Sequence, residues 1–284
     1  MSNSSDIIVV KMGGSAGIDH ALTMDDLASL YPGTRILFIH GANAELDAFQ
    51  RSQGREPQHV TSSSGQTSRF TDQQTMDDLL MVYAGRTNKR LVEGLQARGV
   101  NAVGICGLDG GMARGKRKDA IRIVEDGKPK MLRGDFAGSI TEIDTRLPLL
   151  LLDNGYLPVI SPPALALTGE AINVDGDKLA QRLAQTVGAK ALILLSNTAG
   201  LLADLHDADS LVRRIDVDVE ESVSTAMDAA AGRFKKKVQA GIDAVRAGIP
   251  TVVFADARVA NPITRALAGE GTVVTTAHAG VEHD

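Results

Sequence analysis

The stretch Ile7–Ser15, IIVVKMGGS, joins a short apolar run to a lysine and a pair of glycines. Consecutive apolar residues are typical of a buried strand, and glycines at its end let backbone N–H groups approach an anion closely. Lys11 adds a point charge beside that turn. The spacing is neither that of a Walker A loop nor GxGxxG. The stretch therefore predicts an anion-binding strand end or, alternatively, a tight turn beside a surface lysine.

Further apolar runs follow along the chain, and each is continuous rather than alternating: Arg35–His40, Leu157–Ile160, Ala191–Leu195 and Thr251–Ala255. Continuous runs are expected for a parallel sheet that is covered on both faces. Amphipathic stretches lie between the strands, at Thr75–Arg98, Asp177–Val187 and Arg233–Arg246. This alternation predicts βαβ units, and hence an α/β fold with a doubly wound parallel sheet.

Two regions interrupt the alternation. Residues 104–145 are rich in glycine and charge, and the β-like pieces Ala120–Val124 and Lys130–Arg133 flank the turn Glu125-Asp126-Gly127. That pattern predicts a β-hairpin. Residues 202–225 are acidic and predict a loop with a short helix.

Composition excludes several classes of protein. With 284 residues, 43% hydrophobic and 23% charged, the chain is a soluble globular protein of one large domain or two lobes. A single cysteine, Cys106, excludes an internal disulfide framework, and no Cys/His cluster has zinc spacing. The net charge of −5 argues against nucleic-acid binding. Met1–Asp6 is no signal peptide, and the longest apolar run, Leu147–Leu152, cannot span a bilayer. We expect a cytoplasmic protein.

Two motifs follow the early strands. HGAN, His40–Asn43, ends the second strand, and open α/β sheets bind ligands at the carboxyl ends of their strands. Two glycine-containing strand ends are therefore expected to face one ligand, although a simple turn has the same composition. Arg69, in the stretch SRFTD, suits bidentate binding of a carboxylate or is a solvated surface side chain. Asp72, which ends that stretch, suits the N-cap of the next helix.

Three motifs in the second half place polar residues at helix and strand ends. AINVDGD, Ala171–Asp177, precedes a helix, where Asn and Asp suit turns and N-caps. SNTAGL, Ser196–Leu201, follows a buried strand and suits close backbone approach to a nucleotide. GRFKKKV, Gly232–Val238, puts three lysines at a helix N-terminus, where the macrodipole disfavours cations. This placement predicts an anionic ligand or, alternatively, a solvated run of charge.

Taken together in this order, the six motifs resemble the amino acid kinase family, from Ile7 to about Val274. Within it the resemblance is greatest to the branch of acetylglutamate kinases and [LysW]-aminoadipate kinases. It implies a three-layer αβα sandwich with a mainly parallel central sheet. The single domain would have an acceptor-binding N-lobe, about 1–172, and an ATP-binding C-lobe, about 173–284. The resemblance also implies a homodimer, with ATP and Mg²⁺ as cofactors.

The reaction that the resemblance implies is attack of a carboxylate on the γ-phosphate of ATP, which gives an acyl phosphate. Lys11 and Lys237 would neutralise charge on the transferring phosphoryl group, and Asp177 would orient both lysines. Phosphoryl transfer needs positioning and charge stabilisation more than covalent chemistry. A carboxylate is already ionised at neutral pH, so no general base is needed. This explains why no histidine or serine nucleophile is evident.

The family pattern also implies binding roles. Gly41, Ala42, Arg69 and Asn173 would contact the substrate. Glycine N–H groups would hold phosphate oxygens at Gly13, Gly14 and Gly41, and the ATP-binding loop would include Ser196, Asn197, Gly200 and Leu201. Position 42 departs from the family, because Ala42 stands where a glycine is usual. We expect Ala42 to narrow the acceptor pocket or alter phosphate contacts without abolishing activity.

A basic island distinguishes the possible acceptors. Residues 111–133 carry eight basic and three acidic residues, a net charge of +5. Such an island suits a large acidic partner, or is simply a solvated hairpin. The stretches Tyr83–Lys89, Gly107–Gly110 and Arg133–Asp135 also resemble the carrier-protein branch. We expect the partner to dock on four residues of the island: Arg114, Lys116, Arg117 and Lys118.

In the carrier-protein branch the substrate is 2-aminoadipate, or glutamate, bound through its α-amino group to the small acidic carrier LysW. The resemblance therefore implies lysine biosynthesis through aminoadipate. One alternative is an N-acetylglutamate kinase of arginine biosynthesis, which would be indifferent to residues 114–118. Another is a regulatory binding protein on the same fold. Such a protein would be expected to lose Lys11, Asp177 or Lys237, and all three are present.

Overall fold

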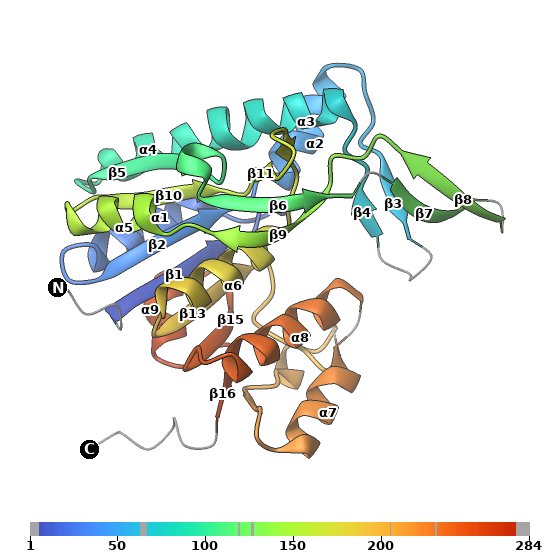
Figure 1. Ribbon diagram of the computed structural model, residues 1–284. Coiled ribbons are helices and arrows are strands. Elements are labelled where there is room, and N and C mark those ends of the chain that lie inside the picture. Colours follow the sequence, from blue (N-terminus) through green and yellow to red (C-terminus); the bar gives the residue numbers. More distant parts are fainter. Residues whose placement is uncertain are drawn as a thin grey trace, which may run out of the picture.

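The computed structural model describes residues 6–62, 67–118, 120–125, 128–204, 206–230 and 232–276. Its centre is an eight-stranded sheet with helices on both faces, a three-layer αβα sandwich (Figure 1). The strand order is β14-β16-β15-β13-β1-β2-β10-β5. The bounds are β1 Ile7–Met12, β2 Arg35–His40, β5 Ala102–Cys106, β10 Leu157–Ser161, β13 Ala191–Ser196, β14 Arg214–Asp216, β15 Thr251–Asp256 and β16 Thr272–Thr275.

The five strands predicted from continuous apolar runs are neighbours at the middle of this sheet. They are β15, β13, β1, β2 and β10, and all pair in parallel. The β15–β16 pair is antiparallel, so the sheet is mainly and not wholly parallel. Three strands of this sheet were not predicted: β5, β14 and β16. Of these, β5 and β14 are edge strands, and β14 lies in the region expected to be a loop with a short helix.

The two faces of the sheet follow the alternation of side chains along each strand. Ile7 and Val9 of β1 belong to the core under α6 and α8, whereas Ile8, Val10 and Met12 belong to the core under α1, α4 and α9. The bounds are α1 His20–Leu30, α2 Asn43–Ser52, α3 Gln73–Leu79, α4 Asn88–Gln96, α5 Arg146–Asp153, α6 Gly176–Val187, α7 Glu220–Ala229, α8 Gly232–Arg246 and α9 Pro262–Leu267. Within the described ranges, no helix is long and apolar enough to cross a membrane.

The predicted helix Thr75–Arg98 begins two residues earlier and is not uniform. It consists of α3, a π-helical segment over Leu80–Thr87 and α4. As predicted, Asp72 caps its start, because the Asp72 side chain accepts a hydrogen bond from the Thr75 N–H (2.8 Å). Two one-turn 3₁₀ helices, Asp109–Gly111 and Ala208–Ser210, lie in loops.

Smaller sheets flank the main one. A four-stranded sheet has the order β12-β11-β6-β9, with β6 Ala113–Arg117, β9 Gly138–Ile143, β11 Ala164–Ala166 and β12 Ala171–Ile172. Two hairpins, β3 His59–Thr61 with β4 Thr67–Arg69 and β7 Ala120–Glu125 with β8 Lys128–Arg133, lie together at one end of the molecule (Figure 1). The second confirms the hairpin predicted from sequence, although turn residues 126 and 127 lie outside the described ranges.

Candidate active site

Two lysines and one aspartate meet beside the carboxyl end of β1. Lys11 Nζ lies 2.6 Å from Asp177 Oδ1, and Lys237 Nζ lies 3.8 Å from Asp177 Oδ2. All three side chains are at least three-quarters buried. The structure therefore brings together residues that are 166 and 60 positions apart in the sequence, as the motif reading expected.

Local structure places each member of this cluster. Asp175 is the N-cap of α6, and its carboxylate accepts hydrogen bonds from the N–H groups of Asp177 (2.8 Å) and Lys178 (3.0 Å). Asp177 therefore occupies the first helical turn. On α8, Phe234 packs edge-on against Phe254 of β15, with ring centroids 5.6 Å apart. This contact holds the helix start that carries Lys237, while Lys235 and Lys236 are exposed.

Burial and charge act in opposite directions on the carboxylate. Burial alone would raise the pKa of Asp177, but the charges of Lys11 and Lys237 outweigh it and lower the pKa to about 2. Burial lowers the pKa of Lys237, the Asp177 charge opposes that shift, and the Lys11 charge adds to it. The site thus holds two ammonium groups against one carboxylate. Its net charge of +1 suits a polyphosphate chain.

The two glycine-containing strand ends lie against each other. A Cβ added at Gly14 would lie 2.2 Å from the Ala42 nitrogen, so only glycine fits there. The N–H groups of Gly13 and Gly41 donate to Leu195 O and Met12 O, both at 2.9 Å. We expected these N–H groups to hold phosphate oxygens, but the chain itself already uses them. Of the three glycine N–H groups expected to hold phosphate oxygens, that of Gly14 donates to no acceptor among the described residues.

The loop after β13 divides into two parts. Ser196 and Asn197 lie at the strand end, where Ser196 Oγ is 3.1 Å from Thr198 Oγ1. Gly200 has a φ of +150°, and a Cβ there would lie 2.6 Å from Thr272 Oγ1. Leu201 is a core residue, 1% exposed, whose N–H donates to the same Thr272 oxygen. Gly200 therefore allows a close approach to Thr272.

The expected substrate contacts lie on a connected network. Arg69 is buried, and its guanidinium donates to Gln50 Oε1 (3.0 Å) and pairs with Asp47, both on α2. Asn173 donates to Thr71 Oγ1 (3.0 Å). Thr71 joins the two, because its hydroxyl also donates to Arg69 O (3.4 Å). Asp135, to which the sequence analysis gave no role, supports this connection, because its Oδ1 accepts from the N–H groups of Thr71 and Ala137. Burial raises the pKa of the Asp135 carboxyl.

Comparison with known proteins assigns this arrangement to a family. The model of the amino acid kinase family matches residues 6–255. This chain belongs to the amino acid kinase family. It is 50% identical to the [LysW]-aminoadipate kinase of Thermus thermophilus over 270 residues, which are 94% of this chain and all of that protein. It is 51% identical to the [LysW]-aminoadipate kinase of Deinococcus radiodurans over 95% of this chain and 91% of that protein.

The same fold occurs in solved structures. N-acetylglutamate synthase from Neisseria gonorrhoeae superposes with a TM-score of 0.75 at 21% sequence identity. The match covers 95% of this chain and 59% of that one. At this identity the likeness shows the αβα fold alone, and it confirms the fold class expected from the motifs.

The departure from the family's usual glycine at position 42 has a structural explanation. Ala42 has a negative φ (−154°), so the backbone at this position does not call for the left-handed conformation that favours glycine. Its methyl group is fully buried in a cluster with Leu46, Val82 and Tyr83. The extra carbon therefore lies in a core cluster.

The four residues of the expected docking surface do not share one face. Side chains alternate along β6, so Arg114 and Lys116 are exposed on one side, and Lys118 after the strand is also exposed. Arg117 turns to the other side, where its guanidinium lies 3.5 Å from the centre of the Phe136 ring and donates to Asp135 O (2.8 Å). Arg117 thus braces the chain beside Asp135.

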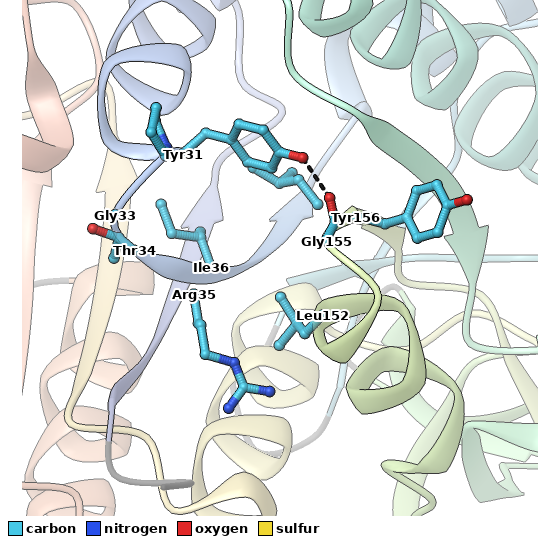
Figure 2. Close-up of a pocket in the computed structure, with 10 residues that line it drawn as sticks. Tyr31, Gly33, Thr34, Arg35, Ile36, Leu152, Gly155 and Tyr156 are labelled. Atoms are coloured by element: carbon cyan, nitrogen blue, oxygen red, sulfur yellow. Dashed lines mark hydrogen bonds between the residues drawn. The ribbon is translucent and has the colours of Figure 1, made fainter. Parts of the chain in front are cut away.

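A cavity of about 400 Å³ lies elsewhere, where β2 and β10 begin. Figure 2 shows the Tyr31 hydroxyl turned toward the Gly155 carbonyl across it. Its lining comes from Tyr31–Ile36 and from Leu152, Gly155, Tyr156 and Leu157. None of the expected kinase site residues is among them. The cavity lies at the amino ends of the parallel strands, whereas the Lys11 cluster lies at their carboxyl ends.

Proposed function

We propose that this chain transfers the γ-phosphoryl group of ATP to the side-chain carboxylate of 2-aminoadipate carried by LysW. The observation that carries the proposal is the Lys11–Asp177–Lys237 cluster in a chain 50% identical to a named [LysW]-aminoadipate kinase over nearly its whole length. The product would be an acyl phosphate, in lysine biosynthesis through aminoadipate. Such a pathway enzyme is expected in the cytoplasm, and the family resemblance favours a homodimer.

The chemistry follows from the charges in the site. A carboxylate oxygen of the acceptor forms a bond to the γ-phosphorus while the bond from that phosphorus to the bridging oxygen of ADP breaks. Negative charge spreads over the transferred oxygens and the leaving oxygen. Lys11 and Lys237 would lie against this charge, and Asp177, ionised at neutral pH, would hold both ammonium groups in position. The attacking carboxylate is already ionised, so no residue need remove a proton.

ATP and acceptor would approach from different parts of the chain. Arg69 supports an acceptor-binding lobe over about 1–172, and Ser196, Asn197 and Lys237 support an ATP-binding lobe over about 173–284. Asn173 lies at the boundary between the two. The two lobes share one sheet, because β1 pairs with β13.

Mg²⁺ would accompany ATP and would supply positive charge at its phosphates. The protein offers few ligands for it, since both Asp177 oxygens face lysines. Among the described residues, no group of three or more His, Cys, Asp or Glu side chains could hold a metal ion. The phosphates themselves would therefore hold a largely hydrated Mg²⁺.

The carrier would dock on the exposed basic side chains of Arg114, Lys116 and Lys118. These residues lie on or directly after β6, which leads to the β7–β8 hairpin at one end of the molecule (Figure 1). A small free acceptor needs only one or two arginines, whereas an acidic protein gains from a wider field of positive charge.

The deciding experiment compares acceptors. Purified enzyme is given ATP, Mg²⁺ and, separately, LysW-linked aminoadipate, LysW-linked glutamate and free N-acetylglutamate. ADP formation is measured, and the acyl phosphate is trapped as its hydroxamate. We expect turnover with the carrier-linked acids. Efficient turnover of N-acetylglutamate alone would assign the chain to arginine biosynthesis and leave the basic side chains of β6 without this role. Aminoadipate and glutamate differ by one methylene, worth only about 1–3 kcal/mol in a pocket.

A further inference from the structure

The long helix beside the site changes its hydrogen-bond period at one place. Between α3 and α4 the segment Leu80–Thr87 is π-helical, and the N–H of Asn88 donates to the carbonyl of Tyr83, five residues earlier. An α-helix pairs each N–H with the fourth preceding carbonyl. Wider π turns occur mostly as short interruptions of α-helices, frequently at functional sites.

The wide turn aligns two side chains. In an α-helix, residues five apart point in directions that differ by about 140°. In a wider π turn these two directions are closer together. Both side chains then reach the same loop, His40–Asn43, at the end of β2. The Tyr83 hydroxyl donates to Asn43 Oδ1 (2.8 Å), and Asn88 Nδ2 lies 3.1 Å from His40 Nε2.

The partners of Asn88 define the histidine tautomer. Asn88 Nδ2 also donates to the carbonyl oxygen of Val159 (2.9 Å), so this atom is the NH₂ group of the amide. His40 Nε2 must therefore accept, and the ring proton is on Nδ1, which lies 3.3 Å from Gly41 O. Burial lowers the pKa of His40 to about 4, which keeps the ring neutral at physiological pH. Asn88 thus holds the ring, and the ring faces the Gly41 carbonyl.

These side chains hold the loop His40–Asn43, which packs against Gly13 and Gly14, the turn expected to bind phosphate. Gly41 N–H donates to Met12 O (2.9 Å), and Ala44 N–H donates to Gly14 O (2.8 Å). The backbones of Gly14 and Ala42 are in direct contact, with no room for a Cβ between them. A shift of the loop would therefore move the Gly14 N–H, three residues after Lys11.

We propose that Tyr83 and Asn88, aligned by the π-helical turn, are positioning residues that hold the His40–Asn43 loop and through it the Gly14 N–H in the geometry for phosphoryl transfer. This inference rests on the proposed kinase function. Neither residue is among those expected to contact the substrate. Together they connect the helix α3–α4 to the catalytic strand β1 through one tightly packed loop.

The test uses Tyr83→Phe, which removes one hydroxyl, together with Asn88→Ala and the double variant. The matched control is Leu95→Ala, because Leu95 is a fully buried residue of α4 in the core under α1 and does not contact the loop. We expect kcat with LysW-linked aminoadipate to fall about 10-fold in each single variant, because small misplacements at a reacting centre cost up to about 10²-fold. KM for ATP should change less than about 2-fold. The control Leu95→Ala should lower Tm at least as much as the test variants do, and it should leave kcat unchanged.

A spectroscopic measurement tests the same contacts without turnover. Histidine ¹⁵N chemical shifts, assigned to His40 with a His40→Asn variant, report which ring nitrogen carries the proton. We expect the Nδ1–H tautomer in the unaltered protein and its loss in Asn88→Ala, with no change in Leu95→Ala. An Nε2–H tautomer in the unaltered protein would overturn the inference. Variants that lower Tm but keep kcat would also overturn it. If no acceptor is phosphorylated by the unaltered protein, the proposed function fails instead, and the tautomer result still stands.

Discussion

At the scale of single residues, the charge balance of the site depends on Asp177. One carboxylate faces two lysines, so the folded protein keeps two buried ammonium groups close together only because this anion lies between them. The balance still leaves one positive charge in excess. Attraction of that kind grows as charge develops on the transferring phosphoryl group, so it favours the transition state over bound ATP.

Replacing Lys11 or Lys237 by alanine is expected to lower kcat about 10²–10³-fold, the usual effect of losing one preorganised group that stabilises transition-state charge. The Kd for ATP, measured by calorimetry, should rise far less, because ground-state binding uses many other contacts. Lys236→Ala is the matched control, since Lys236 is the neighbouring residue on α8 and is exposed. A kcat that survives either substitution would remove that lysine from the mechanism.

At the scale of elements, the alternation along β6 divides a run of basic residues into two roles. Arg114 and Lys116 face outward, while Arg117 packs on Phe136 beside the substrate network. Sequence counting could not separate them, because it gave every basic residue of the island the same weight. The strand period of two makes the separation, and the pairing of β6 with β9 and β11 decides which side is exposed.

Reversing the charge of Lys116 and Lys118 with Lys116→Glu and Lys118→Glu is expected to raise KM for LysW-linked aminoadipate about 10-fold at low salt. The dependence of KM on salt concentration should also become weaker, because screening then has less attraction to remove. The control is Lys190→Glu with Arg265→Glu, an equal change of charge at exposed positions outside the basic island. Steady-state kinetics from low to high salt measure KM for both pairs of substitutions. Equal effects of the two pairs on KM would show that the basic residues of β6 are solvated and do not bind the carrier.

At the scale of the whole molecule, one sheet carries both halves of the chain. β1 pairs in parallel with β2 on one side and with β13 on the other, and β13 is more than 150 residues away from both in the sequence. His40 lies at the end of β2 and is completely buried. An ionisable group in that position makes the stability of the whole fold depend on pH.

The free energy of unfolding is expected to fall as the pH drops from about 6.5 to about 4 because of His40. Its pKa is about 4 in the folded protein against 6.5 unfolded, so the unfolded chain binds the extra proton across this window. The loss amounts to about 3 kcal/mol. Asp177 contributes lower down, since its pKa of about 2 lies below its ordinary value of 3.8.

Urea unfolding followed by circular dichroism between pH 4 and 8 measures this dependence. In the variant His40→Asn, the free energy of unfolding should fall between pH 6.5 and 4 by about 3 kcal/mol less than in the unaltered protein. This holds whatever the stability of the variant at pH 8. An identical pH profile in both proteins would show that His40 keeps an ordinary pKa in the fold.

The amino-acid sequence alone predicted the middle strands of the sheet and the charged residues of the candidate site. Continuous apolar runs predicted the five middle strands, because a strand buried on both faces needs apolar side chains at every position. The six motifs led to Lys11, Asp177 and Lys237, because such chemistry needs particular residue types at strand and helix ends. Edge strands such as β5 and β14 were missed, since a short edge strand has no comparable requirement on composition.

The contacts of the expected site residues, by contrast, followed from the tertiary structure. The N–H groups of Gly13 and Gly41 are used by neighbouring strands, Gly200 approaches Thr272, and the Ala42 methyl lies in a core cluster. The π-helical turn that aligns Tyr83 with Asn88 was equally invisible. Each of these outcomes depends on contacts between segments far apart in the sequence. Local patterns state what a residue can do, whereas the packing of distant segments settles which partner it meets.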